Sequence, residues 1–249
     1  MAKVLEICVD SLASARAAIA GGADRLELCS ALMAGGLTPY EMLLRRIREE
    51  SDIPVRCLMR PRAGDFLYTP EELELLRRQI LQLKNAGADG FVIGCLTADG
   101  ELDKDAMRPL IEACGDKGVT LHRCIDVSRD VVQTYLQAGK LGIDTVLTSG
   151  GASSSWLGKE AIARMIALRE TVGGPEVLIG AGVKASVIRD FRTVLPGARA
   201  FHMSGKTEIE SGMGFRREGV PMGLPGLDEW HIQQTDVEAV KTARIAMDE

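Results

Sequence analysis

The feature that most constrains this chain is an eightfold repeat of a short apolar segment, followed in the first seven copies by a helix-like stretch. Each apolar segment ends in small or polar residues, and neighbouring segments lie roughly 20 to 35 residues apart, the length of one βα unit. The predicted strands are Val4–Cys8, Arg25–Cys29, Val55–Met59, Gly90–Gly94, Val119–Arg123, Thr145–Ser149, Val177–Ala181 and Ala200–Ser204. Eight such units predict an α/β protein of the (β/α)8, or TIM barrel, class.

The length of 249 residues and the lack of a linker rich in Pro, Gly or Ser favour one domain over residues 1–249. Beyond the eighth strand, residues 206–234 are rich in Gly, Pro and Met, and we expect a loop, a lid over the barrel or an oligomer contact there. A final helix is expected from about Asp236. Thr38 and Thr69 each precede a Pro and stand three residues before a Glu, which predicts that both cap helices.

Composition and charge exclude several classes of protein. The 30 basic and 35 acidic residues give a net charge of −5, and no basic tract is interleaved with aromatics, so we expect no nucleic-acid partner. Neither a signal-peptide pattern nor an apolar run of membrane-spanning length occurs, so we expect a cytoplasmic protein that does not enter a membrane. The six cysteines are scattered through the chain, which predicts free thiols in a reducing compartment rather than disulfides.

The first two predicted strands repeat one pattern, Leu-Glu-Ile-Cys and Leu-Glu-Leu-Cys. Side chains alternate along a strand, so the aliphatic residues face the helices, and the Glu and Cys side chains point into the barrel. The inward residues are Glu6 and Cys8 in the first strand and Glu27 and Cys29 in the second. Buried carboxylates need partners, so these two form either a general acid–base pair or a structural ion-pair network with Arg25 or Arg60.

The third and fifth strands end in residues suited to acid–base chemistry or anion binding, and active sites of this fold lie at such strand ends. Arg60 and Arg62 supply forked donors for a carboxylate or phosphate; alternatively, Arg60 neutralises Glu27 across the barrel mouth and Arg62 is solvated. His122 is a candidate general acid or base, with Asp126 orienting either it or Arg123. The competing interpretation of His122 is a core histidine with satisfied hydrogen bonds.

The last three strands end in glycine-rich turns, whose backbone N–H groups can approach an anion closely. The candidate anion-binding residues here are Ser149, Gly150, Gly180, Gly182, Ser204 and Gly205, which join Arg60, Arg62 and Arg123. Neither a GxGxxG segment after the first strand nor a P-loop is present, so no nucleotide cofactor is expected. Together the strand ends predict a site for a small anionic ligand.

Seven stretches of the chain resemble the CutC family, which is named for copper homeostasis. They are Leu5–Cys8, Gly22–Cys29, Gly35–Pro39, Met59–Phe66, His122-Arg123 with Asp126, Leu147–Gly150 and Gly180–Val183, and the resemblance covers residues 4 to about 205. The resemblance implies a cytoplasmic barrel that forms a homo-oligomer, a dimer or a tetramer, and that is linked to cellular copper through Cu(I) binding by cysteines. No established substrate comes with the family.

The residues give their own evidence on copper. Cu(I) prefers thiolate ligands, and Cys8 and Cys29 end adjacent strands about 4.8 Å apart, so their sulfurs could share one ion, with Cys57 and Cys124 as further candidates. There is no CxxC motif, Met-rich run or histidine cluster, and small cysteines also fill crowded barrel interiors. Two other functions stay open: an enzyme that acts on a small anionic or phosphorylated metabolite by Glu/His acid–base chemistry, and a non-catalytic binding or scaffold role.

Overall fold

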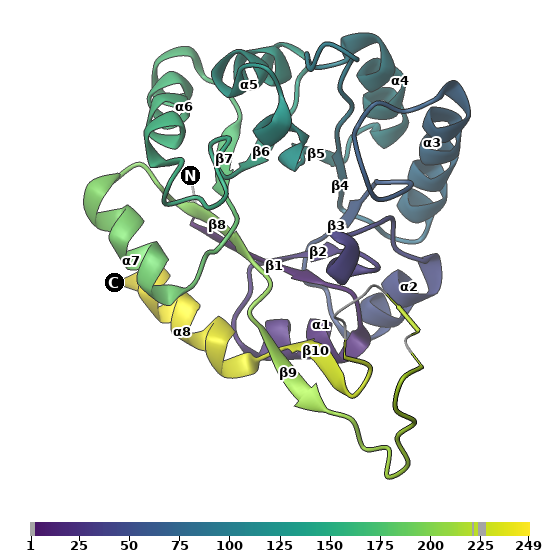
Figure 1. Cartoon of the computed structure of the whole chain (residues 1–249). Coiled ribbons are helices and arrows are strands. Elements are labelled where there is room, and N and C mark those ends of the chain that lie inside the picture. Colours follow the sequence, from purple (N-terminus) through teal and green to yellow (C-terminus); the bar gives the residue numbers. More distant parts are fainter. Residues whose placement is uncertain (1–2, 221, 224–227) are drawn as a thin grey trace.

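A closed barrel of eight parallel strands forms the centre of the protein in the computed structural model, which describes residues 3–220, 222–223 and 228–249 (Figure 1). The strands are β1 (Val4–Val9), β2 (Arg25–Leu28), β3 (Val55–Leu58), β4 (Gly90–Ile93), β5 (Gly118–Leu121), β6 (Thr145–Thr148), β7 (Glu176–Ile179) and β8 (Ala200–Met203). They follow chain order around the barrel, and β1 closes it by pairing with both β2 and β8. The predicted (β/α)8 architecture is confirmed.

Helices surround the barrel and cover its outer face (Figure 1). The α-helices are α1 (Leu12–Ala20), α2 (Glu41–Glu50), α3 (Pro70–Asn85), α4 (Lys104–Cys114), α5 (Val131–Lys140), α6 (Lys159–Val172), α7 (Ala185–Val194) and α8 (Val237–Asp248). Two short 3-10 helices, η1 (Leu32–Ala34) and η2 (Arg123–Val127), follow β2 and β5. In the part of the chain that the structure describes, no helix has both the length and the apolarity needed to cross a bilayer.

The two predicted helix caps have different outcomes. Thr69 caps α3 through a capping box with Glu72, as predicted. Thr38 does not cap α2, which begins at Glu41 and has no side-chain cap, so that prediction is wrong. The Thr38 hydroxyl instead accepts a hydrogen bond from the backbone N–H of Arg60 at 3.0 Å and donates to the Arg60 carbonyl oxygen at 3.1 Å. These two hydrogen bonds hold the segment before α2 against the end of β3.

Alternation along the strands separates an apolar outer layer from a more polar interior. Leu5 and Ile7 are fully buried in the main core, which they share with residues of the surrounding helices, whereas Glu6 between them pairs with Arg25. Two small apolar clusters lie apart from this core: one is Cys8, Cys29, Leu58 and Val92, and the other is Leu147, Leu178 and Ala200. Ion pairs therefore occupy interior space that apolar side chains do not fill.

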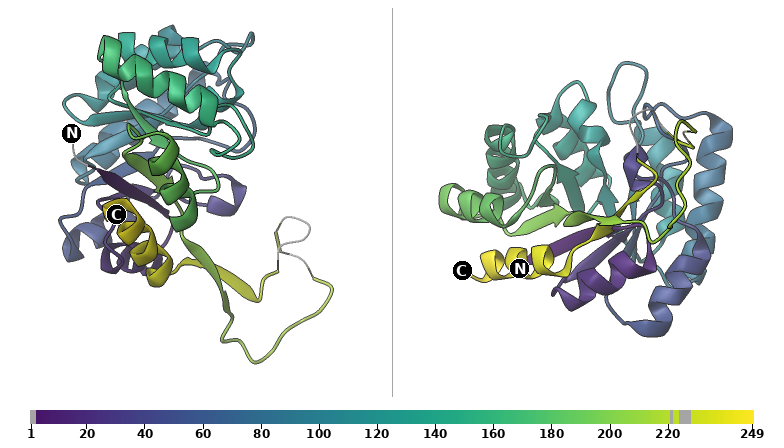
Figure 2. Two further views of the ribbon diagram at one scale, coloured as in Figure 1. Left: turned by 90° about the vertical axis from the view of Figure 1, so that its left-hand side faces the viewer. Right: turned by 60° about the horizontal axis from the view of Figure 1, so that its bottom comes forward.

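Beyond β8 the chain forms a two-stranded antiparallel ribbon, β9 (Lys206–Glu210) and β10 (His231–Thr235), which extends away from the barrel (Figure 2). Two hydrogen bonds tie its base to the barrel. The backbone N–H of Thr235 donates to Ser14 Oγ at 3.1 Å, and Thr235 Oγ1 donates to the Ser204 carbonyl oxygen at 3.1 Å. The ribbon base is thereby fixed beside the strand ends.

The segment of residues 206–234 thus has strands at both ends, where the sequence indicated irregular structure. Its residues 221 and 224–227 lie outside the described part of the chain. The final helix begins at Val237, and the side chain of Asp236 caps it. That the segment acts as a lid or as an oligomer contact stays a prediction.

Candidate functional site

A cavity of about 670 Å³ opens at the C-terminal ends of the barrel strands, beside the base of the ribbon. The predicted site residues that line it are Cys8, Glu27, Cys29, Arg60, His122, Arg123, Asp126, Gly182 and Ser204. The predicted site residues outside its lining are Glu6, Arg62, Ser149, Gly150, Gly180 and Gly205. The fold therefore brings most of the predicted charged and sulfur-bearing groups to one chamber.

His202 on β8 is held by a buried ion-pair network on the neighbouring strands. Its Nδ1 lies 2.8 Å from Oε1 of Glu6, and Oε2 of Glu6 accepts a hydrogen bond from Nε of Arg25 at 2.5 Å. Strand register explains these contacts, because β1 pairs Glu6 with His202 on one side and with Arg25 on the other. Burial opposes the charge of Glu6, but Arg25 and His202 outweigh it and lower its pKa to about 2. Glu6 is therefore a carboxylate held by Arg25, as in the ion-pair alternative that the sequence left open, and it orients an imidazole.

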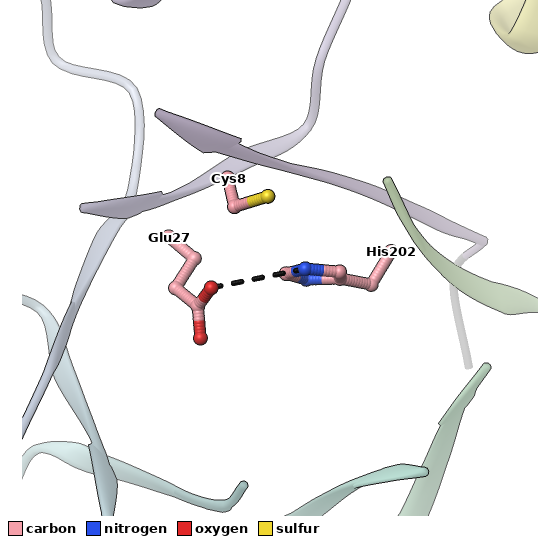
Figure 3. A group of neighbouring side chains, drawn as sticks. All are labelled: Cys8, Glu27 and His202. Atoms are coloured by element: carbon pink, nitrogen blue, oxygen red, sulfur yellow. Dashed lines mark ion pairs between the residues drawn. The ribbon is translucent and has the colours of Figure 1, made fainter. Parts of the chain in front are cut away.

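The other ring nitrogen of His202 faces Glu27, and Cys8 lies beside the two side chains (Figure 3). Nε2 lies 3.7 Å from Oε2 of Glu27, and ligand atoms of the three residues all lie within 4.8 Å of one another. Burial favours a neutral ring, yet Cys8 and the carboxylates of Glu27 and Glu6 hold the pKa of His202 well above its ordinary value. Burial also raises the pKa of Glu27. The protonated imidazole of His202 thus lies among the thiol group of Cys8 and the acidic side chains of Glu6 and Glu27.

Cys29 lines the same cavity but, among the described residues, does not belong to this group of ligand atoms. The register of β1 and β2 places Cys8 opposite Glu27, so Cys29 lies further along the barrel axis than the predicted pairing requires. Its thiol donates to Oε2 of Glu27 at 3.4 Å, and burial together with Glu27 raises its pKa well above the ordinary value. Cys57 and Cys124 belong to the main core. The ligand atoms of Cys8, a histidine and a carboxylate thus lie within 4.8 Å of one another, whereas Cys29 shares only a small apolar cluster with Cys8.

The turn after β6, a predicted anion site, forms hydrogen bonds with other residues of the protein. Asp126 accepts hydrogen bonds from Thr148 Oγ1 at 2.5 Å, from the backbone N–H of Ser149 at 2.9 Å and from Nε of Arg123 at 2.7 Å. Arg123 also donates to Ser149 Oγ at 3.1 Å. Gly150 has a φ of +74°, a conformation that favours glycine. The sequence predicted that Asp126 orients either His122 or Arg123, and the structure shows that it orients Arg123.

Of the remaining candidates for anion binding, some line the cavity and others lie outside it. Arg62 pairs with Asp65 at 2.9 Å and Glu72 at 2.6 Å, outside the lining of the cavity. At Gly180 a Cβ atom would lie 2.6 Å from Cδ1 of Leu147, so this glycine permits close packing. Gly182 and Ser204 line the cavity and Gly205 does not.

His122 is buried and neutral. Its Nδ1 accepts a hydrogen bond from the backbone N–H of Cys124 at 3.1 Å. Burial, with a smaller contribution from the Arg60 charge, lowers its pKa from 6.5 to about 3. Gly94 makes room for the ring, because a Cβ atom there would lie 2.6 Å from Cε1 of His122. A neutral ring of such low pKa donates a hydrogen bond more readily than it accepts a proton.

Comparison with known proteins decides the family. The model of the CutC family matches residues 3–207. This chain belongs to the CutC family. The human copper homeostasis protein cutC homolog is 40% identical over 242 residues, which cover 96% of this chain and 87% of the human protein. A family protein CutC of Xanthomonas campestris is 45% identical over 205 residues, which cover 82% of this chain and 84% of that protein.

A solved structure shows the same fold. A protein of Streptococcus agalactiae assigned as the copper homeostasis protein CutC superposes with a TM-score of 0.75 at 24% identity, and the match covers 81% of this chain and 98% of that one. The predicted membership of the CutC family and the predicted barrel are thus both confirmed.

His202 is the residue of this CutC-family protein that sequence analysis missed. The signal was present, because Phe201 and Met203 are apolar and lie in the main core on the outer side of β8. Alternation then turns His202 inward, by the argument that placed Glu6 between two aliphatic neighbours.

Proposed function

We propose that this CutC-family protein binds one Cu(I) ion at the barrel mouth through the sulfur of Cys8 and Nε2 of His202. The observation that carries the proposal is the contact between Glu6 and Nδ1 of His202, which fixes the ring and leaves Nε2 without that carboxylate in a group of ligand atoms that includes Cys8 and Glu27. Histidines that bind metals are characteristically held in this way, with a carboxylate on the nitrogen that does not touch the metal. Arg25 fixes Glu6 in turn, so the orientation rests on a buried ion pair.

The donor set fits copper in its reduced state. A thiolate is the soft ligand that Cu(I) prefers, and imidazole also suits copper. Glu27, with a carboxylate oxygen within 4.8 Å of both ligand atoms, adds negative charge beside the ion. Because ligands bind metals in their deprotonated forms, the ion would replace the proton of His202 and any proton on Cys8. The name of the human relative, a copper homeostasis protein, supports the same metal.

Titration of the metal-free protein with Cu(I) against a competing chelator, without oxygen, tests this proposal. The wild type should take up one Cu(I) per chain. Cys8→Ser and His202→Gln each remove a ligand atom and should weaken binding by about 100-fold or more. Cys29→Ser is the matched control, since it removes a buried thiol from the same cavity, and it should change the affinity by less than about threefold. Loss of uptake in Cys29→Ser but not in Cys8→Ser would contradict the proposal.

A further inference from the structure

Two buried hydrogen-bond donors in the wall of the cavity have no partner among the residues that the structure describes. They are Nε of Arg60 and Nε2 of His122. The two residues are 9% and 4% exposed, so neither nitrogen is hydrated through an open surface. Burying a donor without an acceptor costs free energy, and native proteins leave few such atoms unless a ligand, ion or water satisfies them.

Arg60 also carries a buried charge without a counter-ion. Its terminal nitrogens donate to the backbone carbonyl oxygens of Ala34 at 3.2 Å, Gly36 at 3.1 Å and Gly64 at 3.0 Å. Within the described ranges, no carboxylate oxygen lies within the 4.0 Å of an ion pair with it, Glu27 included. A buried guanidinium without an anion is costly, so an anion is the partner that this corner lacks.

His122 offers a proton to the cavity and not a lone pair. Because the N–H of Cys124 donates to Nδ1, the proton of the neutral ring is on Nε2. One aromatic side chain borders both donors: the ring centre of Phe66 lies 4.9 Å from that of His122 and 5.3 Å from Cζ of Arg60. The cavity thus has a corner with one cationic donor, one neutral donor and one apolar wall.

We propose that the corner formed by Arg60, His122 and Phe66 binds the oxyanion group, a carboxylate or a phosphate, of a small organic molecule. Arg60 supplies the charge, and Nε2 of His122 supplies a second donor. Phe66 is half-buried and packs against both groups, so its ring forms the apolar wall of the corner. This corner is separate from the Cys8–His202 group, and its occupation does not require a bound metal.

Three carboxylates of the described residues line the cavity, and Asp10 among them accepts a hydrogen bond from the backbone N–H of Leu32 at 3.3 Å. Asp126 pairs with Arg123 at 2.7 Å. Oε2 of Glu27 lies 3.7 Å from Nε2 of His202. The charge of Arg60 therefore stays available to a ligand.

Thermal unfolding of the metal-free protein in inorganic phosphate, in succinate and in sodium chloride, at matched ionic strength, tests this proposal. At tens of millimolar, phosphate or succinate should raise the melting temperature in a saturable way that chloride does not reproduce. Protection by phosphate alone identifies a phosphorylated ligand, and protection by succinate alone identifies a carboxylate. Absence of protection by both anions would overturn the proposal.

Variants separate this corner from general effects of charge. His122→Asn retains an oxygen that accepts from the N–H of Cys124 but lacks Nε2, and its affinity for the protecting anion should fall about tenfold. Arg60→Lys keeps the charge but lacks Nε, so it should lose a similar factor and serves if His122→Asn does not fold. Arg78→Gln removes a charge on α3 from an exposed side chain that pairs with Glu74, and should bind as the wild type does. Wild-type affinity in both corner variants would also overturn the proposal.

Discussion

Oε1 of Glu6 and Nδ1 of His202 lie 2.8 Å apart, across the pairing of β1 with β8 that closes the barrel. The second oxygen of the same carboxylate holds Arg25 on β2. One buried glutamate therefore links three consecutive strands of the barrel and also orients the histidine of the candidate metal site. A change at Glu6 should affect folding stability and metal binding together.

Glu6→Gln should lower the free energy of unfolding by about 3 kcal/mol, because it leaves Arg25 as an uncompensated buried charge. The same variant should weaken Cu(I) binding by about 10- to 100-fold, the effect expected when the partner that orients a ligand is lost. Urea denaturation and chelator competition measure the two effects.

Glu50→Gln is the control for Glu6→Gln, since Glu50 pairs with Arg16 on the surface. A surface ion pair contributes little to stability, so this variant should leave both measurements near the wild-type values. Equal stability of Glu6→Gln and wild type would show that the buried network does not support the fold.

The buried state of His122 predicts a dependence of stability on pH. Its pKa is about 3 in the folded protein and near 6.5 in the unfolded chain, so between these values the unfolded chain takes up a proton that the native state does not. The free energy of unfolding should therefore decrease as pH falls below 6.5, by about 1.4 kcal/mol per pH unit from this group alone. Denaturation at pH 5 to 6.5 should show a shallower slope for His122→Asn, and identical slopes would contradict this state of His122.

Gly94→Ala should disturb the His122 site. The added Cβ would meet Sγ of Cys124 and would lie 2.6 Å from Cε1 of His122, so one of these buried groups must shift. Overpacking of this kind costs about 1–3 kcal/mol of stability, which chemical denaturation measures. Gly212→Ala is the matched control, because among the described residues no atom outside its two chain neighbours lies within 4 Å of a Cβ there, and it should be neutral.

The barrel and the inward direction of the Glu and Cys side chains were predictable, because both follow from local periodicity. Alternation between Leu5, Glu6 and Ile7 determines which side chains reach the interior, and the structure confirms it. The missed residue, His202, obeys the same rule. It was overlooked because the single inward histidine of β8 follows no repeated pattern like that of the first two strands.

Register between strands was not predictable from these patterns. The two similar Glu-x-Cys segments suggest that Cys8 pairs with Cys29, whereas the stagger of a barrel places Cys8 opposite Glu27. The partners of strand-end charges also depend on the loops. Asp126 is engaged by the turn after β6, which leaves fewer free groups for acid–base chemistry than the sequence suggested. Enzymatic activity on a small anionic metabolite and a cytoplasmic location stay predictions.

The expectation of a homo-oligomer also stays a prediction. Sedimentation velocity of the full chain should show a dimer or a tetramer. A single species at the monomer mass of 26.8 kDa over a range of protein concentrations would contradict it.

The copper K-edge X-ray absorption spectrum of protein loaded with one Cu(I) per chain tests the central claim most directly. The spectrum counts the sulfur atoms bound to the metal. Ligation by Cys8 and His202 predicts one sulfur, with nitrogen or oxygen as the remaining ligands, and loss of that sulfur in Cys8→Ser. Two sulfurs at the metal, or an unchanged spectrum in Cys8→Ser, would contradict the claim.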